Sequence, residues 1–153
     1  MSDESKVSFS LLFPILESKI RDGHSFSFTA SGVSMLPFIR NGKDQVTLSP
    51  ITRPLKAGDI IFYRRRNGIF VLHRIVKKEK DGSFTLCGDN QYYLEKNIQE
   101  DQIIAILTEL KRNGKNVSLS SPKARAWSRY LPARRFILHV RASIKGRMKK
   151  LFS

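Results

Sequence analysis

The spacing of hydrophobic residues changes twice along this chain of 153 residues, and it divides the chain into three parts. The first hydrophobic stripe recurs at three- and four-residue steps, which predicts a short amphipathic helix over residues 8–21. Pro14 fits such a helix only in its first turn, and Gly23 is a suitable C-cap. The residues of this stripe are Leu12, Ile15, Leu16 and Ile20.

From residue 25 onward, hydrophobic and polar residues alternate in short runs, which is typical of β-strands with one buried face. Residues 101–112 also fit a helix, but their β-branched start and the turn at Asn113 favour a strand. Strands this short and closely spaced predict a mainly β fold, in which a mostly antiparallel sheet curls on itself like a barrel. The expected strands lie at residues 25–32, 44–50, 58–65, 68–79, 82–90 and 101–112, with a last strand after residue 114.

The last part of the chain, residues 121–152, returns to helical spacing. Ser120 or Ser121 is a suitable N-cap, and Pro122 fits the first helical position. Pro132 is expected to break this segment. After it, the apolar stripe consists of Ile137, Val140, Ile144, Met148 and Leu151, and Arg134, Arg135, Arg141, Lys145, Lys149 and Lys150 lie mostly off the stripe.

Composition and charge support a division into a β domain at 1–120 and a basic amphipathic helical tail at 121–153. A chain of this length with 41% hydrophobic residues fits one modest core plus an appendage. The net charge of +15 at pH 7 is uneven, because no Asp or Glu follows Glu109. The tail therefore predicts an anionic partner.

The tail has two interpretations of equal weight. It packs Trp127 and Tyr130 onto the sheet, or it lies on an anionic membrane surface. Nucleic acid ranks below both, because the chain carries no motif for reading a groove.

The sequence also predicts a compartment. A lone cysteine, Cys87, cannot form an internal disulfide, so a reducing compartment is expected. The N-terminus lacks a basic region, and the hydrophobic run at 11–16 is too short for a signal peptide or a membrane span. We expect a cytoplasmic protein without a transmembrane helix, attached peripherally at the inner face of the membrane if the tail binds lipid.

Three segments, SGVSMLP, VLHRIV and CGDN, carry a hydroxyl, an imidazole and a carboxylate in Ser34, His73 and Asp89. A serine hydrolase needs these three groups as nucleophile, base and orienting partner. Ser34 lies in a Gly-flanked turn, and His73 alternates with apolar residues, which favours its neutral form. Taken alone, each is more often a turn Ser, a strand His and a turn Asp.

Together with GDIIFY, these segments resemble the superfamily of type I signal peptidases and self-cleaving repressor-type serine peptidases, over residues 25–110. The resemblance implies a β-rich peptidase fold with Ser34 as nucleophile. It implies His73 as general base, as in the branch that uses His in place of Lys, and Asp89 as its partner. The oxyanion would bind to the Ser34 amide and to neighbouring amides, for which we expect Gly32, Val33 and Met35.

The expected substrate is a peptide or a leader-bearing protein, held extended by strand addition. Phe26, Phe28 and Val71 are expected to line its cleft. No cofactor and no metal are expected, because one Cys and three scattered His residues give no ligand spacing.

Other assignments remain open. Lys77 and Lys78 are rival candidates for the base, although a solvated charge run is the plainer interpretation. Cys87 is a rival nucleophile, but such a residue is more often a small packed group. The alternative function is an inactive peptidase-like module that binds peptide or an anionic membrane or partner surface. A nucleic-acid-binding β-barrel is a third, weaker hypothesis.

Overall fold

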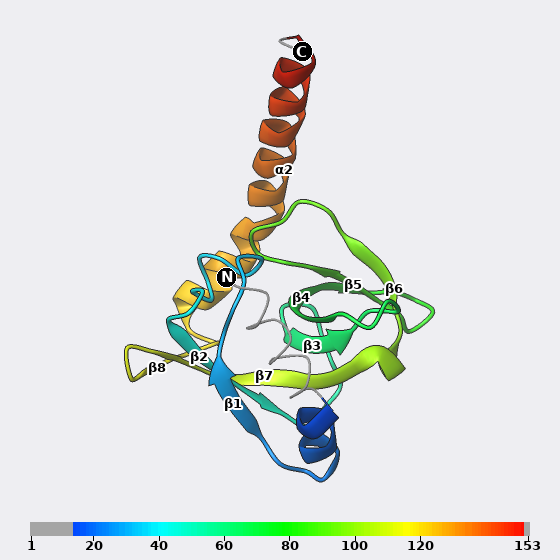
Figure 1. Ribbon diagram of the computed structural model, residues 1–153, viewed down its shortest axis with the longest axis vertical. Coiled ribbons are helices and arrows are strands. Elements are labelled where there is room, and N and C mark those ends of the chain that lie inside the picture. The colour runs from blue at the N-terminus through cyan, green and yellow to red at the C-terminus, as the bar shows by residue number, and fades with distance from the viewer. Residues whose placement is uncertain (1–13, 152–153) are drawn as a thin grey trace.

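One curled antiparallel sheet forms the body of the protein. The computed structural model describes residues 14–151, with side chains described as far as residue 145. The strand order is β1-β2-β7-β3-β4-β5-β6, and β8 pairs with β7 (Figure 1). The strands are β1 (Phe26–Thr29), β2 (Asp44–Ser49), β3 (Ile60–Arg64), β4 (Phe70–Lys78), β5 (Phe84–Cys87), β6 (Glu95–Ile98), β7 (Ile103–Arg112) and β8 (Lys115–Val117).

The predicted mainly β fold is confirmed, and so is the strand assignment of 101–112. Within the described residues the sheet curls without closing, since β1 and β6 stand at the two ends of the strand order. Register shifts between Thr47 and Leu48, and between Phe62 and Tyr63, fall where β7 pairs with its neighbours, and such bulges increase bending and twist. β6 was not predicted, because the sequence EKNI does not alternate.

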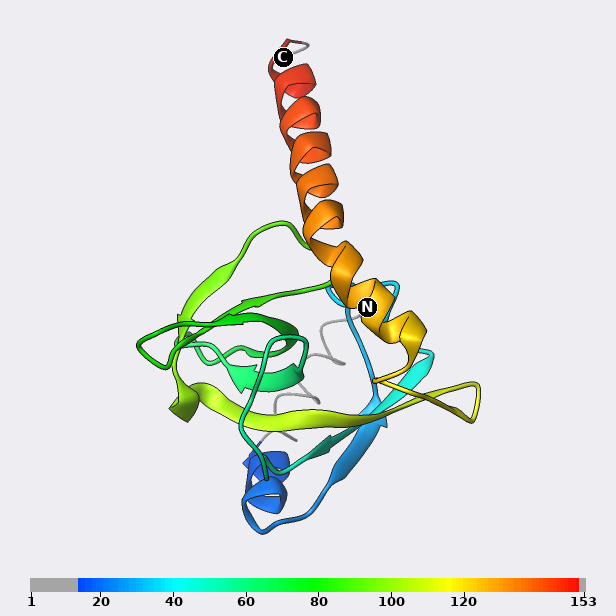
Figure 2. The ribbon, with the colours of Figure 1, turned by 180° about the vertical axis from the view of Figure 1, so that it is seen from behind.

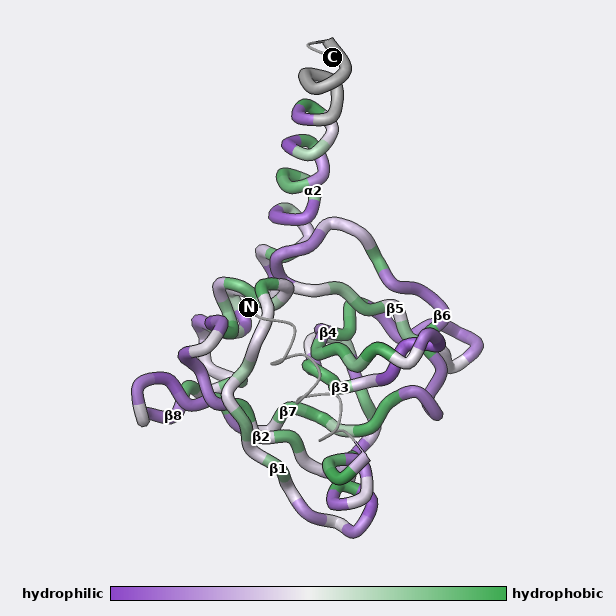
Figure 3. The backbone as a smooth tube through the Cα atoms, viewed as in Figure 1, coloured by the Kyte–Doolittle hydropathy of each residue, from purple (hydrophilic) through white to green (hydrophobic). Residues whose placement is uncertain are grey.

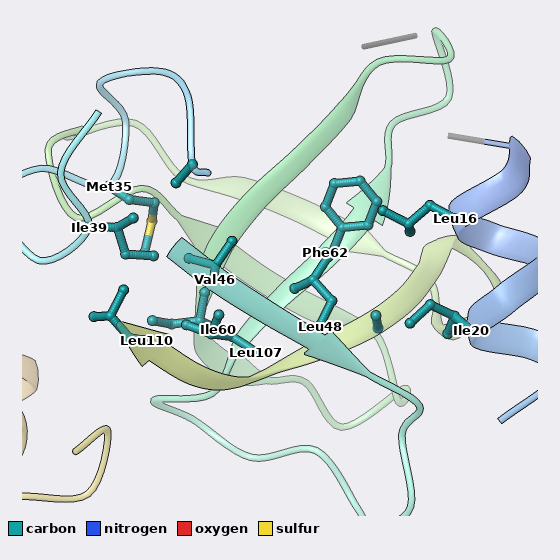
Figure 4. Close-up of a cluster of buried hydrophobic side chains, with 12 residues drawn as sticks. Leu16, Ile20, Met35, Ile39, Val46, Leu48, Ile60, Phe62, Leu107 and Leu110 are labelled. Carbon is teal, nitrogen blue, oxygen red and sulfur yellow. The ribbon is translucent and has the colours of Figure 1, made fainter. Parts of the chain in front are cut away.

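The core has two hydrophobic clusters, one on each face of β3. Ile60 and Phe62 belong to the first cluster, whereas Ile61 and Tyr63 belong to the second. Figure 4 shows the first cluster, in which β2 and β7 pack against the N-terminal helix. A strand buried on both faces is a nearly continuous apolar run, as in IIFY.

The N-terminal helix is confirmed over residues 14–21. Leu16 and Ile20 are buried in the first cluster, as the stripe predicted. Ile15 is wrongly assigned to the stripe, since it is 54% exposed. The predicted stripe residue Leu12 lies outside the described residues.

The C-terminal helix α2 (Pro122–Leu151) begins as predicted, with the Ser121 hydroxyl accepting a hydrogen bond from the Ala124 amide at 3.1 Å. The predicted break at Pro132 is wrong, because α2 continues through it. Leu131 is only 1% exposed, so packing on the body holds the helix at this point. Figures 1 and 2 show α2 changing direction where it leaves the body. Within the described residues, no helix has the length and apolar character needed to cross a bilayer.

Candidate active site

The Ser34 loop joins β1 to β2, and Asp44 closes its base. The Ala30 amide donates to the Asp44 carbonyl at 2.9 Å, and Arg40 and Arg112 donate to the Asp44 carboxylate. Burial alone would raise the pKa of Asp44, but the hydrogen bonds from Arg112 and Arg40 outweigh burial and lower it. The base of the loop is therefore held by a charged carboxylate.

Within the loop, Met35 and Ile39 are 5% and 3% exposed and belong to the first cluster. The Met35 side chain therefore anchors the loop in the core and cannot contact a substrate, so the prediction for Met35 is kept for its backbone amide alone. Gly32 has φ of 103°, in the left-handed region that favours glycine, and Val33 is 60% exposed. The Leu36–Pro37 peptide bond is cis.

The polar groups of Ser34 that chemistry would use are not engaged. In the part of the chain that the structure describes, no hydrogen bond occupies the Ser34 hydroxyl or the amides of Ser34 and Met35. Two free amides next to a serine hydroxyl suit the binding of an oxyanion.

The segment after β5 holds the Ser34 loop in place. The Asn90 amide donates to the Ser34 carbonyl at 2.8 Å, and Asn90 Nδ2 donates to the Val33 carbonyl at 3.2 Å. A Cβ on Gly88 would lie 2.6 Å from the Ser34 carbonyl oxygen, so only glycine permits this close approach.

The sheet register relates Gly88 to His73. Arg74 pairs with Cys87, and continuing that register by one residue sets Gly88 across from His73. Directly opposed residues of antiparallel strands point to the same side of the sheet. A Gly88 Cβ would thus point to the His73 side, where it would meet the Ser34 carbonyl.

His73 is buried, at 1% exposure, beside two polar side chains from neighbouring strands. Its Nδ1 lies 3.3 Å from the Tyr63 hydroxyl and 3.2 Å from Glu95 Oε1. The Tyr63 hydroxyl donates its proton to Glu95 Oε2 at 2.7 Å, and the Arg65 guanidinium binds both Glu95 oxygens. Since the Tyr63 proton is already used, Nδ1 must carry the imidazole proton, which leaves a lone pair on Nε2.

The charges at this site follow from burial and hydrogen bonding. Burial lowers the pKa of His73 to about 4, although Glu95 acts in the opposite direction. Burial would raise the pKa of Glu95, but hydrogen bonds from Arg65 and Tyr63 outweigh it and leave the pKa below its usual value. At neutral pH the site therefore holds a neutral imidazole beside an ionised carboxylate.

Asp89 has a different partner from the one predicted. Its carboxylate accepts hydrogen bonds from Arg74 Nε and Nη2 at 2.9 and 2.7 Å, and from Trp127 Nε1 at 2.8 Å. The prediction that Asp89 holds His73 is corrected, since Glu95 occupies that position. Successive residues of a strand point to opposite sides, so Arg74 and Asp89 lie on the side away from His73.

The predicted cleft residues do not share one surface. Phe26 and Phe28 pack against the first cluster, and Val71 packs against the second. A groove of about 1000 Å³ lies nearby, and its lining includes Phe38 from the Ser34 loop and Ser128 from α2. Ser34 and His73 are not among its lining residues.

Sequence reasoning missed Glu95, Arg65 and Tyr63 as partners of His73. For Tyr63 a signal was present, because the alternation of β3 places it on one face with Ile61, which pairs with His73. For Glu95 no signal was available, since its segment lacks periodicity.

This open, curled sheet, whose glycine-flanked Ser34 loop contacts the segment after β5, defines a peptidase-like β domain. A sequence model of the family described as Peptidase S24-like matches residues 3–121, and the chain belongs to this family. The match confirms the predicted superfamily. No curated protein matches the chain.

Proposed function

We propose that the protein is a serine peptidase in which Ser34 attacks a peptide carbonyl and His73 Nε2 takes its proton. The carrying observation is the position of His73 Nδ1, which lies 3.3 Å from the Tyr63 hydroxyl and 3.2 Å from Glu95 Oε1. Because the Tyr63 hydroxyl donates to Glu95, this position favours the proton on Nδ1 and the lone pair on Nε2. A pKa of about 4 keeps this imidazole neutral and able to act as a base at physiological pH. In this arrangement Glu95, rather than Asp89, orients the base.

The loop geometry supports the attack. The Ser34 loop approaches on the His73 side of the sheet at Gly88, and the free amides of Ser34 and Met35 would bind the oxyanion. His73 would then pass its proton to the leaving amine, which leaves an acyl group on Ser34. Water deprotonated by His73 would release the acyl group and restore the hydroxyl.

The substrate class that fits is an extended peptide, such as a leader-bearing chain. Gly32 and Val33 are exposed beside the nucleophile, and the groove at Phe38 begins four residues beyond Ser34. These surfaces would contact the residues next to the cut bond.

Labelling with a serine-reactive phosphonate, read by mass spectrometry, tests the proposal. We expect one adduct on Ser34, which Ser34→Ala removes and His73→Gln slows by about a hundredfold or more. Ser31→Ala is the matched control, because Ser31 is exposed in the same loop. Equal labelling of wild type and Ser34→Ala would overturn the assignment of the nucleophile.

A peptide-binding module without turnover is the second candidate. It is favoured by one observation: within the described residues no hydrogen bond joins the Ser34 hydroxyl to His73. For this candidate, wild type and Ser34→Ala would bind peptides from a mixed library with the same affinity. Neither protein would be labelled by the phosphonate or cleave the peptides at any pH from acidic to alkaline.

A further inference from the structure

The outer part of α2 exposes an apolar surface that nothing in the described structure covers. Phe136, Ile137, Val140 and Ile144 are 69%, 46%, 38% and 54% exposed. We call these four residues the outer face of α2. Figure 3 shows hydrophobic and hydrophilic bands alternating along this part of the helix, which projects from the body.

The outer face differs from the face by which α2 packs on the body. Leu131 is buried, and Trp127 and Arg134 bind the segment at Asp89 and Asn90. At a helical turn of about 3.6 residues, Ile137, Val140 and Ile144 fall on one stripe, turned away from Leu131. Burial against the sheet therefore does not account for the outer face.

Exposed positive charges flank the outer face. Arg141 and Lys145 are exposed. Arg141 lies four residues after Ile137, so the side chains of Ile137 and Arg141 are neighbours on the helix surface. No acidic residue follows Glu109 in the sequence, so no carboxylate on α2 offsets these charges. The surface therefore combines apolar groups with uncompensated cations.

We propose that the outer face of α2 docks on an anionic lipid bilayer. The apolar side chains would enter the interface, while Arg141 and Lys145 stay level with the anionic headgroups. A nucleic acid would use the cations but leave the apolar stripe in water. A second copy of α2 would bring like charges together at the same face, which opposes self-association.

Co-sedimentation of the full chain with vesicles tests this docking. We expect binding to phosphatidylcholine vesicles that contain phosphatidylglycerol, a decrease with added salt, and at least tenfold weaker binding to phosphatidylcholine alone. Ile137→Gln with Ile144→Gln should weaken binding by about tenfold or more. Arg141→Gln with Lys145→Gln should do the same on anionic vesicles.

Matched controls lie on the body of the protein. Ile69→Gln removes an isoleucine that is 52% exposed, and Lys80→Gln removes an exposed lysine, and both should leave binding unchanged. Ser34→Ala should also bind normally, so a failure of docking is distinguishable from a failure of the proposed chemistry. Circular dichroism of each variant verifies that α2 is intact.

Three results would overturn the docking. They are no binding to anionic vesicles, equal loss of binding in the body controls, and a dimer in sedimentation equilibrium that Ile137→Gln with Ile144→Gln dissociates. Tighter binding to a DNA duplex than to anionic vesicles, lost in the Arg141 and Lys145 variant, would reassign the surface to nucleic acid.

Discussion

His73 and Arg74 are neighbours on β4, yet each builds a different kind of polar site. Arg74 meets Asp89 on one side of the sheet, in an ion pair whose side chains are 6% and 0% exposed. His73 meets Glu95 on the other side, where the carboxylate is held by Arg65 and Tyr63.

The two sites differ in how their polar groups are paired. Arg74 donates two hydrogen bonds to Asp89, which also accepts one from Trp127, so the first site serves as a fixed clamp between β4, Asp89 and α2. Burial leaves His73 neutral beside a charged Glu95, so this site keeps a group that can accept a proton. A step of one residue thus separates a structural ion pair from a buried neutral imidazole, which is the candidate base.

The largest effect is expected from breaking the clamp. Asp89→Asn removes the charge that compensates the buried Arg74, and we expect a loss of about 3 to 5 kcal/mol in the free energy of unfolding. Urea denaturation at neutral pH measures this loss. Glu17→Gln, which breaks the exposed pair with Arg21, should cost less than about 0.5 kcal/mol. Similar losses in the two variants would show that the clamp is not structural.

A smaller effect, on rate, is expected on the other side of the sheet. Glu95→Gln removes the negative charge that faces His73 Nδ1, and phosphonate labelling of Ser34 should slow by about a hundredfold. Because the Glu95 charge raises the pKa of His73, the pH at which labelling begins should also move lower. Glu100→Gln is the exposed control. An unchanged pH profile would remove Glu95 from the positioning of the base.

The smallest effect concerns stability against pH. His73 has a pKa of about 4 when folded and 6.5 as a free side chain, so only the unfolded chain takes up its proton between these values. Stability is therefore complete above pH 6.5 and falls as the pH drops, by about 2 kcal/mol from pH 7 to roughly pH 5.

Urea denaturation at stepped pH measures this slope, and His73→Gln should flatten it. His24 and His139 are exposed, and the lowered pKa values of Asp44 and Glu95 place their own losses at more acidic pH. A slope that survives His73→Gln would mean that His73 is not the buried neutral group.

The alternation of the sequence was enough to predict the sheet, because Val46 and Leu48, like Phe84 and Leu86, keep a strict period of two. The alternation was not enough to predict which polar side chains contact each other across the strands. The family resemblance implied Asp89 as the partner of His73, but the register that opposes Arg74 to Cys87 turns Asp89 toward Arg74. Pairing register depends on long-range contacts, which a single strand does not encode.

The C-terminal helix α2 also shows that long-range contacts can override what the local sequence predicts. Pro132 locally disfavours a helix, and the burial of Leu131 overrides that preference through packing. The candidate nucleophile and base were named from sequence, whereas Glu95 required the fold, because its strand carries no periodic pattern.

The hydrogen bonds from Trp127 to Asp89 and from Arg134 to Asp89 and Asn90 affect where a fragment for expression should end. The family match ends at residue 121, before either side chain. A fragment trimmed to that limit would expose the indole-binding edge of Asp89 and leave Asn90 without its guanidinium donor. A fragment that keeps these contacts therefore extends past Arg134, beyond the residue at which the family match ends.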